Sequence, residues 1–312
     1  MLAGMILNTP LQNARTPAVR DLIWTLLSPP LLAATAKAQR HPLQASIWQR
    51  EPERLHAWLL QQEQSPAALL SWLTHKPLHR LGLYYERLWQ FALHAAPDLE
   101  VVAANLPLRQ NGKTLGEMDL LLRDAEGEHH LELAVKFYLG PRTADGADTT
   151  HWLGPNGHDR LDLKLAHLTR QQLPLSSRRE ARSTLRLLHM EQPAAAFWMS
   201  GYLFQPWPQG CTPPRGASDA HLRGHWLYRR DWADFAAQHP GACWQPLPRL
   251  AWLARARVEA SERWPEENVQ QWLHAQPEHA KTQLLVRLEE DQTGDWLEVQ
   301  RLFVLNDQWP EV

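Results

Sequence analysis

The sequence predicts an α/β fold. Between Leu115 and Leu139, two segments of β-compatible residues flank the turn-forming residues 124–128, a pattern typical of an antiparallel β-hairpin. Amphipathic helical patterns precede and follow this region, over residues 78–95 and 159–173, and an apolar segment at 194–205 has the length of a buried strand. Helices and strands that alternate along one chain bury their apolar faces against each other, which defines this fold class.

The bulk composition is that of a globular protein. The chain has 312 residues, of which 44% are hydrophobic and 21% are charged, enough for one large domain or two smaller ones. A formal net charge of -2 excludes a globally basic nucleic-acid-binding protein, so any such contact must come from a local patch. The 16 tryptophans are scattered along the chain, and we expect them to fill the core rather than to stack on bases.

Two features favour a cytoplasmic location. The first ten residues, MLAGMILNTP, lack the basic start and the long apolar run of a secretory or transmembrane segment, so no membrane partner is expected. The chain has only two cysteines, Cys211 and Cys243, which fits free thiols in a reducing compartment. A disulfide between these two cysteines is the alternative.

Residues 1–77 predict a helical region. Helical patterns cover residues 15–40, with a break at Ser28-Pro29-Pro30, and continue over 48–62 and 65–74. Nothing in this region indicates chemistry, because its histidines lack the tight spacing of a structural zinc site.

The helix predicted over 78–95 carries Glu86 within a mostly apolar segment. One interpretation is a surface glutamate that pairs with Arg80 or Arg87, and the other is a functional carboxylate. Residues 99–108 then predict the first strand of a meander, followed by a turn that leads into the hairpin.

Side chains of the hairpin strands alternate between two faces of the predicted sheet. Pairing the apolar rows of both strands on the core side brings Asp119, Glu132 and Lys136 together on the opposite face. Two carboxylates and a lysine on one sheet surface are able to hold a divalent metal ion. The alternative is a polar sheet face on which Lys136 pairs with one of the two acids.

The segment Gly116-Glu117-Met118-Asp119-Leu120-Leu121, with Glu132 and Lys136 downstream, resembles the core motif of the PD-(D/E)XK nuclease superfamily. The longer string through Leu139 also resembles an uncharacterised bacterial family of that superfamily, called domain of unknown function 1853. The resemblance implies a restriction-endonuclease-like core of a helix, an antiparallel meander, a second helix and a strand. It also implies three regions: N-terminal helices at 1–77, the nuclease-like core at 78–206, and a C-terminal α+β extension at 207–312.

This resemblance implies a metal-dependent phosphodiester hydrolase, a nuclease acting on DNA. Asp119 and Glu132 would bind Mg²⁺ or Mn²⁺, with Glu86 as an optional third carboxylate. Lys136 would orient the attacking water or stabilise charge on the phosphate. Glu117, on the same face as Asp119, would be a spare ligand or a group that orients one.

The sequence departs from the superfamily pattern at one position. The usual second motif is acid-x-Lys, which requires an acid at position 134, but Ala134 stands there and the acid lies earlier, at Glu132. The alternative function is therefore a catalytically inactive nuclease-fold protein that binds nucleic acid or a protein partner. A helical and β-sandwich-like interaction protein is a third interpretation, which the Trp-rich C-terminal half favours.

The helix predicted over 159–173 places Lys164 and Gln171 in one row. This row is either a solvated face or, as the resemblance implies, a face that borders the active site and contacts phosphate oxygens. A basic cluster follows, and either it contacts the phosphate backbone or it too is merely solvated. The cluster consists of Arg178, Arg179 and Arg182, with Arg170 and Arg186 nearby.

The remaining segments carry weaker signals. The loop 140–158 is long enough to suggest a functional segment or a lid. Its His151, Asn156 and His158 would suit a His-based nuclease loop, although no strand–helix signature accompanies them. Beyond residue 215 the sequence predicts a strand near Trp226 and two helices. It ends in an apolar hairpin formed by residues 283–288 and 296–305.

Overall fold

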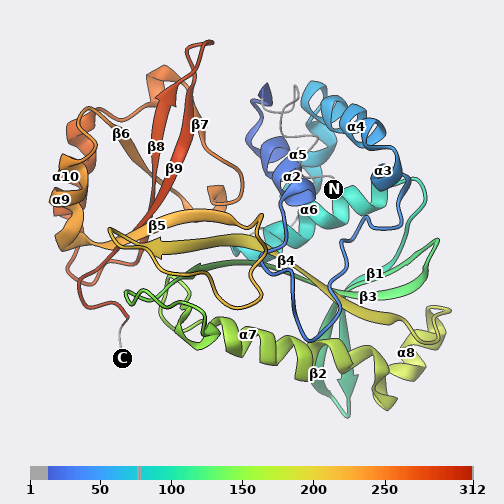
Figure 1. Cartoon of the computed structure of the whole chain (residues 1–312). Helices are drawn as coiled ribbons and strands as arrows, with labels where there is room; N and C mark the ends of the chain where they lie inside the picture. The colour runs from blue at the N-terminus through green and yellow to red at the C-terminus, as the bar shows by residue number, and fades with distance from the viewer. Residues whose placement is uncertain (1–12, 76, 78, 311–312) are drawn as a thin grey trace. The chain divides into compact units, whose positions relative to one another are not determined.

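The computed structural model describes residues 13–75, 77 and 79–310, and these form a mixed α/β structure, as predicted (Figure 1). The chain divides into two compact units. The first contains the described residues through Val135 together with Lys164–Ser200, and the second contains Lys136–Leu163 and the residues from Gly201 onward. The division falls inside two strands and one helix. The three predicted regions, which divide the chain at other places, remain a prediction.

The N-terminal helices belong to the first unit. The helix predicted over 48–62 is divided in two, because the ring of Pro52 lacks an N–H and starts a new helix at its own position. Leu78, the predicted start of the Glu86 helix, lies outside the described residues, and the helix is observed from Leu81. The helices are α2 (Pro17–Leu27), α3 (Ile47–Arg50), α4 (Pro52–Gln64), α5 (Ala67–Thr74) and α6 (Leu81–Ala95).

An antiparallel meander follows, formed by β1 (Glu100–Gln110), β2 (Lys113–Asp124) and β3 (Gly127–Leu139). The β1–β2 turn is Asn111-Gly112, with φ values of 49° and 76°. Two positive φ angles define the type I′ turn, which suits the right-handed twist of paired strands and favours Asn-Gly. Strand β4 (Ala194–Pro206) lies next to β3 in the strand order and begins in the first unit.

The β2–β3 register determines which side chains share a face. Leu120 pairs with Leu131 and Leu121 pairs with His130, so the next position places Asp119 opposite Glu132. Both faces of this hairpin are buried, contrary to the expected polar face. The reason is that residues of the 173–187 segment pack against Leu121, which forms one core cluster with Leu175, Leu185 and others.

The helix predicted over 159–173 changes its winding along its length. It begins as α7 (Leu161–His167), continues as a π-helix over Leu168–Gln172, and tightens into a 3₁₀-helix over Leu173–Ser177. A further 3₁₀ turn leads into α8 (Arg182–Leu187). A π turn contains one residue more than an α turn, so it shifts the side chains that follow it by one position.

From Gly201 onward the strand order is β4-β5-β9-β8-β6, with the short β7 (Arg257–Val258) on β9. Strand β5 (Leu222–Tyr228) is parallel to both β4 and β9. The predicted C-terminal hairpin is present as β8 (Gln283–Glu290) and β9 (Trp296–Leu305). Helices α9 (Trp232–Ala237) and α10 (Glu266–Ala275) lie beside β6 (Cys243–Leu247) (Figure 1). Their apolar residues form one core cluster with residues of β6, β8 and β9.

The structure bears on three expectations: a lid at 140–158, the state of the two cysteines, and membrane-spanning helices. The 140–158 loop is anchored by Trp152, which is fully buried and donates its indole N–H to the Gly146 carbonyl at 2.7 Å. Cys211 and Cys243 are free, so the alternative of a disulfide is wrong. Among the described residues, no helix is long and apolar enough to cross a membrane.

Candidate active site

The candidate site begins with a pair of carboxyl groups on neighbouring strands. Asp119 of β2 and Glu132 of β3 face each other, and a hydrogen bond joins their carboxyl groups. Burial raises the pKa of both groups to about 7, and a hydrogen bond between two carboxyl groups requires that one of them carries a proton, so the pair shares a proton near neutral pH. Oδ2 of Asp119 also accepts the Leu133 backbone N–H at 2.9 Å.

Glu132 is fully buried, and its oxygens are held from two further directions. Its Oε1 lies 2.8 Å from Nε2 of His130, and its Oε2 accepts the side-chain amide of Gln172. Burial lowers the pKa of His130 to about 4, so the ring is neutral near pH 7. Nδ1 of the same ring lies 3.0 Å from the Ser176 hydroxyl, so both ring nitrogens have polar neighbours. The orientation of Glu132 is thus set before any ligand arrives.

A third carboxyl group comes from helix α6. Burial is the main cause that raises the pKa of Glu86 to about 7, and the charge of Asp119 adds to it. Asn105 of β1 donates from Nδ2 to Glu86 at 3.0 Å and to Glu117 at 3.5 Å, and it accepts from Gln90 at 2.7 Å. The predicted third acid therefore lies near the pair. Neither Asn105 nor Gln90 was predicted as a site residue, although an asparagine inside a strand is uncommon enough to serve as a signal.

One lysine acts on all three acids. The charge of Lys164 lowers the pKa of Glu86, Asp119 and Glu132, but burial outweighs it and the pKa of each is raised to about 7. Nζ of Lys164 donates to Oε1 of Gln172 at 2.9 Å, which completes a chain from Lys164 through Gln172 to Glu132. The π turn explains why Gln172, rather than the expected Gln171, makes this contact.

Lys136 has a different environment. It lies in the second unit, where its ammonium donates to Oδ2 of Asp159 and forms an ion pair at 2.5 Å. The hydroxyl of the buried Tyr138 donates to the other oxygen of Asp159 at 3.3 Å. The role assigned to Lys136 in a reaction remains a prediction.

The acidic residues fit a hard divalent cation. They are oxygen donors, they are largely buried, and their raised pKa values show that the nearby positive charge does not balance them. In the described part of the chain, no group of three or more His, Cys, Asp or Glu side chains is arranged to hold a metal ion. An ion at Asp119 and Glu132 would therefore complete its shell with water, backbone carbonyl or substrate oxygens, as Mg²⁺ commonly does.

Comparison with known proteins identifies the family. The chain matches the family described as "Domain of unknown function (DUF1853)" over residues 20–305. It belongs to this family. No curated protein and no solved structure matches the chain. All residues of the acidic site lie inside the matched range, so the site is part of the DUF1853 domain itself.

The basic cluster of this DUF1853 protein lies on the segment that follows the π turn. Arg179 and Arg182 are exposed, as are Arg170 and Arg186, while Arg178 is half-buried. Within the described residues, none of these five side chains forms an ion pair with an acid. Guanidinium groups without a carboxylate partner are available to phosphate oxygens.

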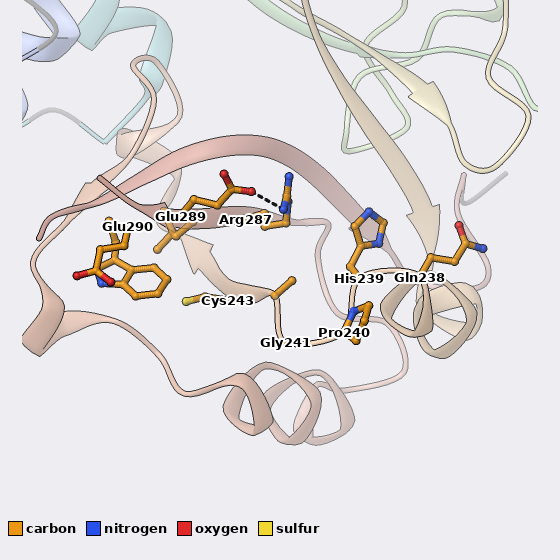
Figure 2. A pocket seen from close by; sticks show the side chains of 11 residues that line it. Gln238, His239, Pro240, Gly241, Cys243, Arg287, Glu289 and Glu290 are labelled. Atoms are coloured by element: carbon orange, nitrogen blue, oxygen red, sulfur yellow. Dashed lines mark hydrogen bonds and ion pairs between the residues drawn. The ribbon is translucent and has the colours of Figure 1, made fainter. Parts of the chain in front are cut away.

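A separate cavity of about 410 Å³ lies in the second unit of the DUF1853 chain (Figure 2). It is lined by residues of the turn before β6 and by the end of β8, and Arg287 forms an ion pair with Glu289 at 2.7 Å beside it. None of the predicted site residues lines it. Its lining includes Gln238, His239, Pro240, Cys243, Glu290 and Trp296.

Proposed function

We propose that this DUF1853 protein is a metal-dependent phosphodiester hydrolase that acts on DNA, with a restriction-endonuclease-like core of the PD-(D/E)XK type. The order α6, β1, β2, β3, α7, β4 supports the core, because it repeats the helix, meander, helix and strand that the motif implies. The observation that carries the proposal is the buried Asp119–Glu132 pair, which shares a hydrogen bond beside Glu86.

Each residue has a defined part in the proposal. Asp119 and Glu132 would hold Mg²⁺ or Mn²⁺, with Glu86 beside them. When bound, such an ion polarises the phosphodiester and lowers the pKa of a bound water. His130 and Gln172 keep Glu132 in one orientation, which avoids reorganisation when the substrate arrives.

The cationic groups would serve the substrate. Lys164, whose charge lowers the pKa of all three acids, would meet a phosphate there, and Lys136 would serve as the motif lysine. Arg178, Arg179 and Arg182 would bind the DNA backbone through phosphate contacts, which carry no sequence information. Gln171, which is exposed on the same segment, would contribute to this surface.

Cleavage of supercoiled plasmid in Mg²⁺ or Mn²⁺ tests the proposal. We expect the wild-type protein to cut and the Asp119→Asn and Glu132→Gln variants to be silent, since each keeps its shape and loses a ligand charge. Lys164→Ala and Lys136→Ala, assayed in parallel, show which lysine the reaction needs. Glu53→Gln, on the exposed face of α4, is the matched acidic control and should cut normally. Cutting that survives Asp119→Asn would reject the site.

A specific observation favours a second candidate, a nuclease-fold protein that binds nucleic acid or a protein without cutting. Position 134 is Ala134, and the described residues contain no group of three metal-binding side chains. In that case both wild type and Asp119→Asn would retain DNA binding in a filter or anisotropy assay while neither cuts.

A further inference from the structure

Asn105 has a backbone conformation that its strand does not require. Its φ is 50°, although it lies inside β1 between the pairs Ala104–Leu120 and Leu106–Met118. A left-handed conformation is costly for most residues with a Cβ atom; asparagine tolerates it better than others, but it is disfavoured in strands. Residues held this way persist only where the surroundings over-determine them, and they cluster at functional sites.

The side-chain amide of Asn105 forms hydrogen bonds with residues of the acidic site. Asn105 stands opposite Asp119 in the β1–β2 register. Its carboxamide nitrogen donates to Glu86 at 3.0 Å and to Glu117 at 3.5 Å, and its oxygen accepts from the buried Gln90 at 2.7 Å. An amide can make all three contacts at once, because it carries two donor hydrogens and one acceptor oxygen.

The other asparagine with a left-handed backbone has an ordinary explanation. Asn111, with φ 49°, occupies the first position of the β1–β2 turn, where the turn geometry demands a positive φ. No turn explains Asn105. Its conformation instead coincides with a carboxamide that binds one carboxylate from a helix and contacts another from a strand.

We propose that Asn105 is a positioning residue, which holds the Glu86 carboxylate where its negative charge acts on a divalent cation bound by Asp119 and Glu132, without Glu86 being a third direct ligand; this inference rests on the proposed function. Gln90 fixes the orientation of the amide, so that its nitrogen, and not its oxygen, faces Glu86. The β1 strand thereby joins a helix acid to the strand acids of the site.

The test is Mn²⁺ binding by the full-length protein, followed by electron paramagnetic resonance and calorimetry, with thermal unfolding measured in parallel. Asn105→Leu keeps the approximate size of the side chain but removes both the amide donor to Glu86 and the acceptor for Gln90. Asn105→Ala removes the amide and keeps the strain, whereas Asn105→Gly removes both. We expect all three variants to bind Mn²⁺ about 10-fold or more weakly, the loss seen when groups that orient metal ligands are removed.

Stability separates the strain from the positioning. Asn105→Gly should melt at a higher temperature than Asn105→Ala, because glycine adopts a positive φ without steric cost. The pair Asn111→Gly and Asn111→Ala is the matched control: it should show the same order of melting temperatures with no change in Mn²⁺ affinity. Equal melting temperatures for the two Asn105 variants would show that no strain is stored there and overturn the inference.

A double-mutant cycle distinguishes positioning from a general loss of structure. If Asn105 acts through Glu86, then Asn105→Ala should cost almost nothing further in the Glu86→Gln background. Additive losses, or wild-type Mn²⁺ affinity in all three Asn105 variants, would overturn the inference and leave the proposed function standing. No Mn²⁺ binding by the wild-type protein would instead overturn the proposed function together with this extension.

Discussion

Glu132 illustrates how a single residue acquires its chemistry from what covers it. On an exposed strand its carboxylate would be an ordinary anion, but here it is fully buried against His130, Gln172 and Asp119. Burial raises its pKa to about 7, as it does for Asp119 and Glu86. Near neutral pH the site therefore retains protons that a cation has to displace.

Proton displacement makes cation affinity dependent on pH. We expect the affinity of the wild-type protein for Mn²⁺ to increase between about pH 6 and pH 8, by up to about tenfold per pH unit for each proton released. Raised carboxyl pKa values also mean that folding stability falls as pH rises from about 4 through about 7, and bound Mn²⁺ should restore it. Melting curves with and without Mn²⁺ at each pH check both points. If Mn²⁺ stabilised the Asp119→Asn variant as strongly as the wild-type protein, both expectations would be contradicted.

His41 gives a second pH effect of opposite sign. Its Nε2 lies 3.1 Å from the Leu26 carbonyl, its Nδ1 accepts the Leu43 N–H at 3.2 Å, and its ring packs edge-on against Trp89 and Trp198. A ring that accepts at Nδ1 is neutral, and burial lowers its pKa from 6.5 to about 4.

A lowered histidine pKa contributes stability that is present above about pH 6.5 and is lost as pH falls through about 4. We expect wild type to lose about 2–3 kcal/mol of unfolding free energy relative to His41→Gln over this interval, because the wild-type protein takes up a proton on His41 when it unfolds and the variant does not. Urea titrations at several pH values measure the difference. If the unfolding free energies of the two proteins changed in parallel with pH, His41 would have the same pKa in the folded and the unfolded state, contrary to this prediction.

At the scale of elements, the π turn at Leu168–Gln172 decides which polar residue enters the site. A regular helix would place Gln171 in the row of Lys164, whereas the extra residue places Gln172 there. The same turn leaves Gln171 exposed beside the arginine segment. Two adjacent glutamines therefore have different environments, which makes them a matched pair.

Replacement of these glutamines tests the winding of the helix. Gln172→Ala removes a donor from the buried Glu132, so we expect a loss of about 1–3 kcal/mol in unfolding free energy together with weaker Mn²⁺ binding. Gln171→Ala should change stability by less than about 0.5 kcal/mol. Urea unfolding of both variants checks this order. The reverse order would mean that the segment is a continuous α-helix in solution.

At the scale of the whole molecule, charge is segregated rather than uniform. A chain with a net charge of -2 carries five arginines between 170 and 186, and none of their side chains pairs with an acid among the described residues. Such a segment attracts phosphates locally while the protein as a whole remains near neutrality.

Salt dependence of DNA binding measures this segment directly. We expect replacement of Arg178, Arg179 and Arg182 together by alanine to reduce the slope of log affinity against log salt by about 2–3, since each phosphate contact contributes about 0.9. Arg249→Ala, an exposed arginine of the second unit, is the control. Fluorescence anisotropy with a labelled duplex at several salt concentrations gives the slopes. An unchanged slope for the triple variant would show that DNA does not contact this segment.

Local pattern was sufficient for much of the fold. Strand alternation placed Asp119 and Glu132 on one face, and the turn at Asn111-Gly112 joins its strands as short-range rules expect. The C-terminal hairpin and both helices of the second unit also follow from periodicity. These features depend on residues that are close in the chain, so the sequence alone determines them.

Tertiary packing decided the chemistry of the site. Whether Glu86 approaches Asp119, whether Lys164 or Lys136 is the lysine that acts on the acids, and which glutamine reaches Glu132 all depend on how distant segments cover one sheet face. The same packing buries the acids and raises their pKa values, and it leads Asn105 into a conformation that no local rule predicts. Desolvation and long-range contact are properties of the assembled layers, and therefore no pattern within a short window specifies them.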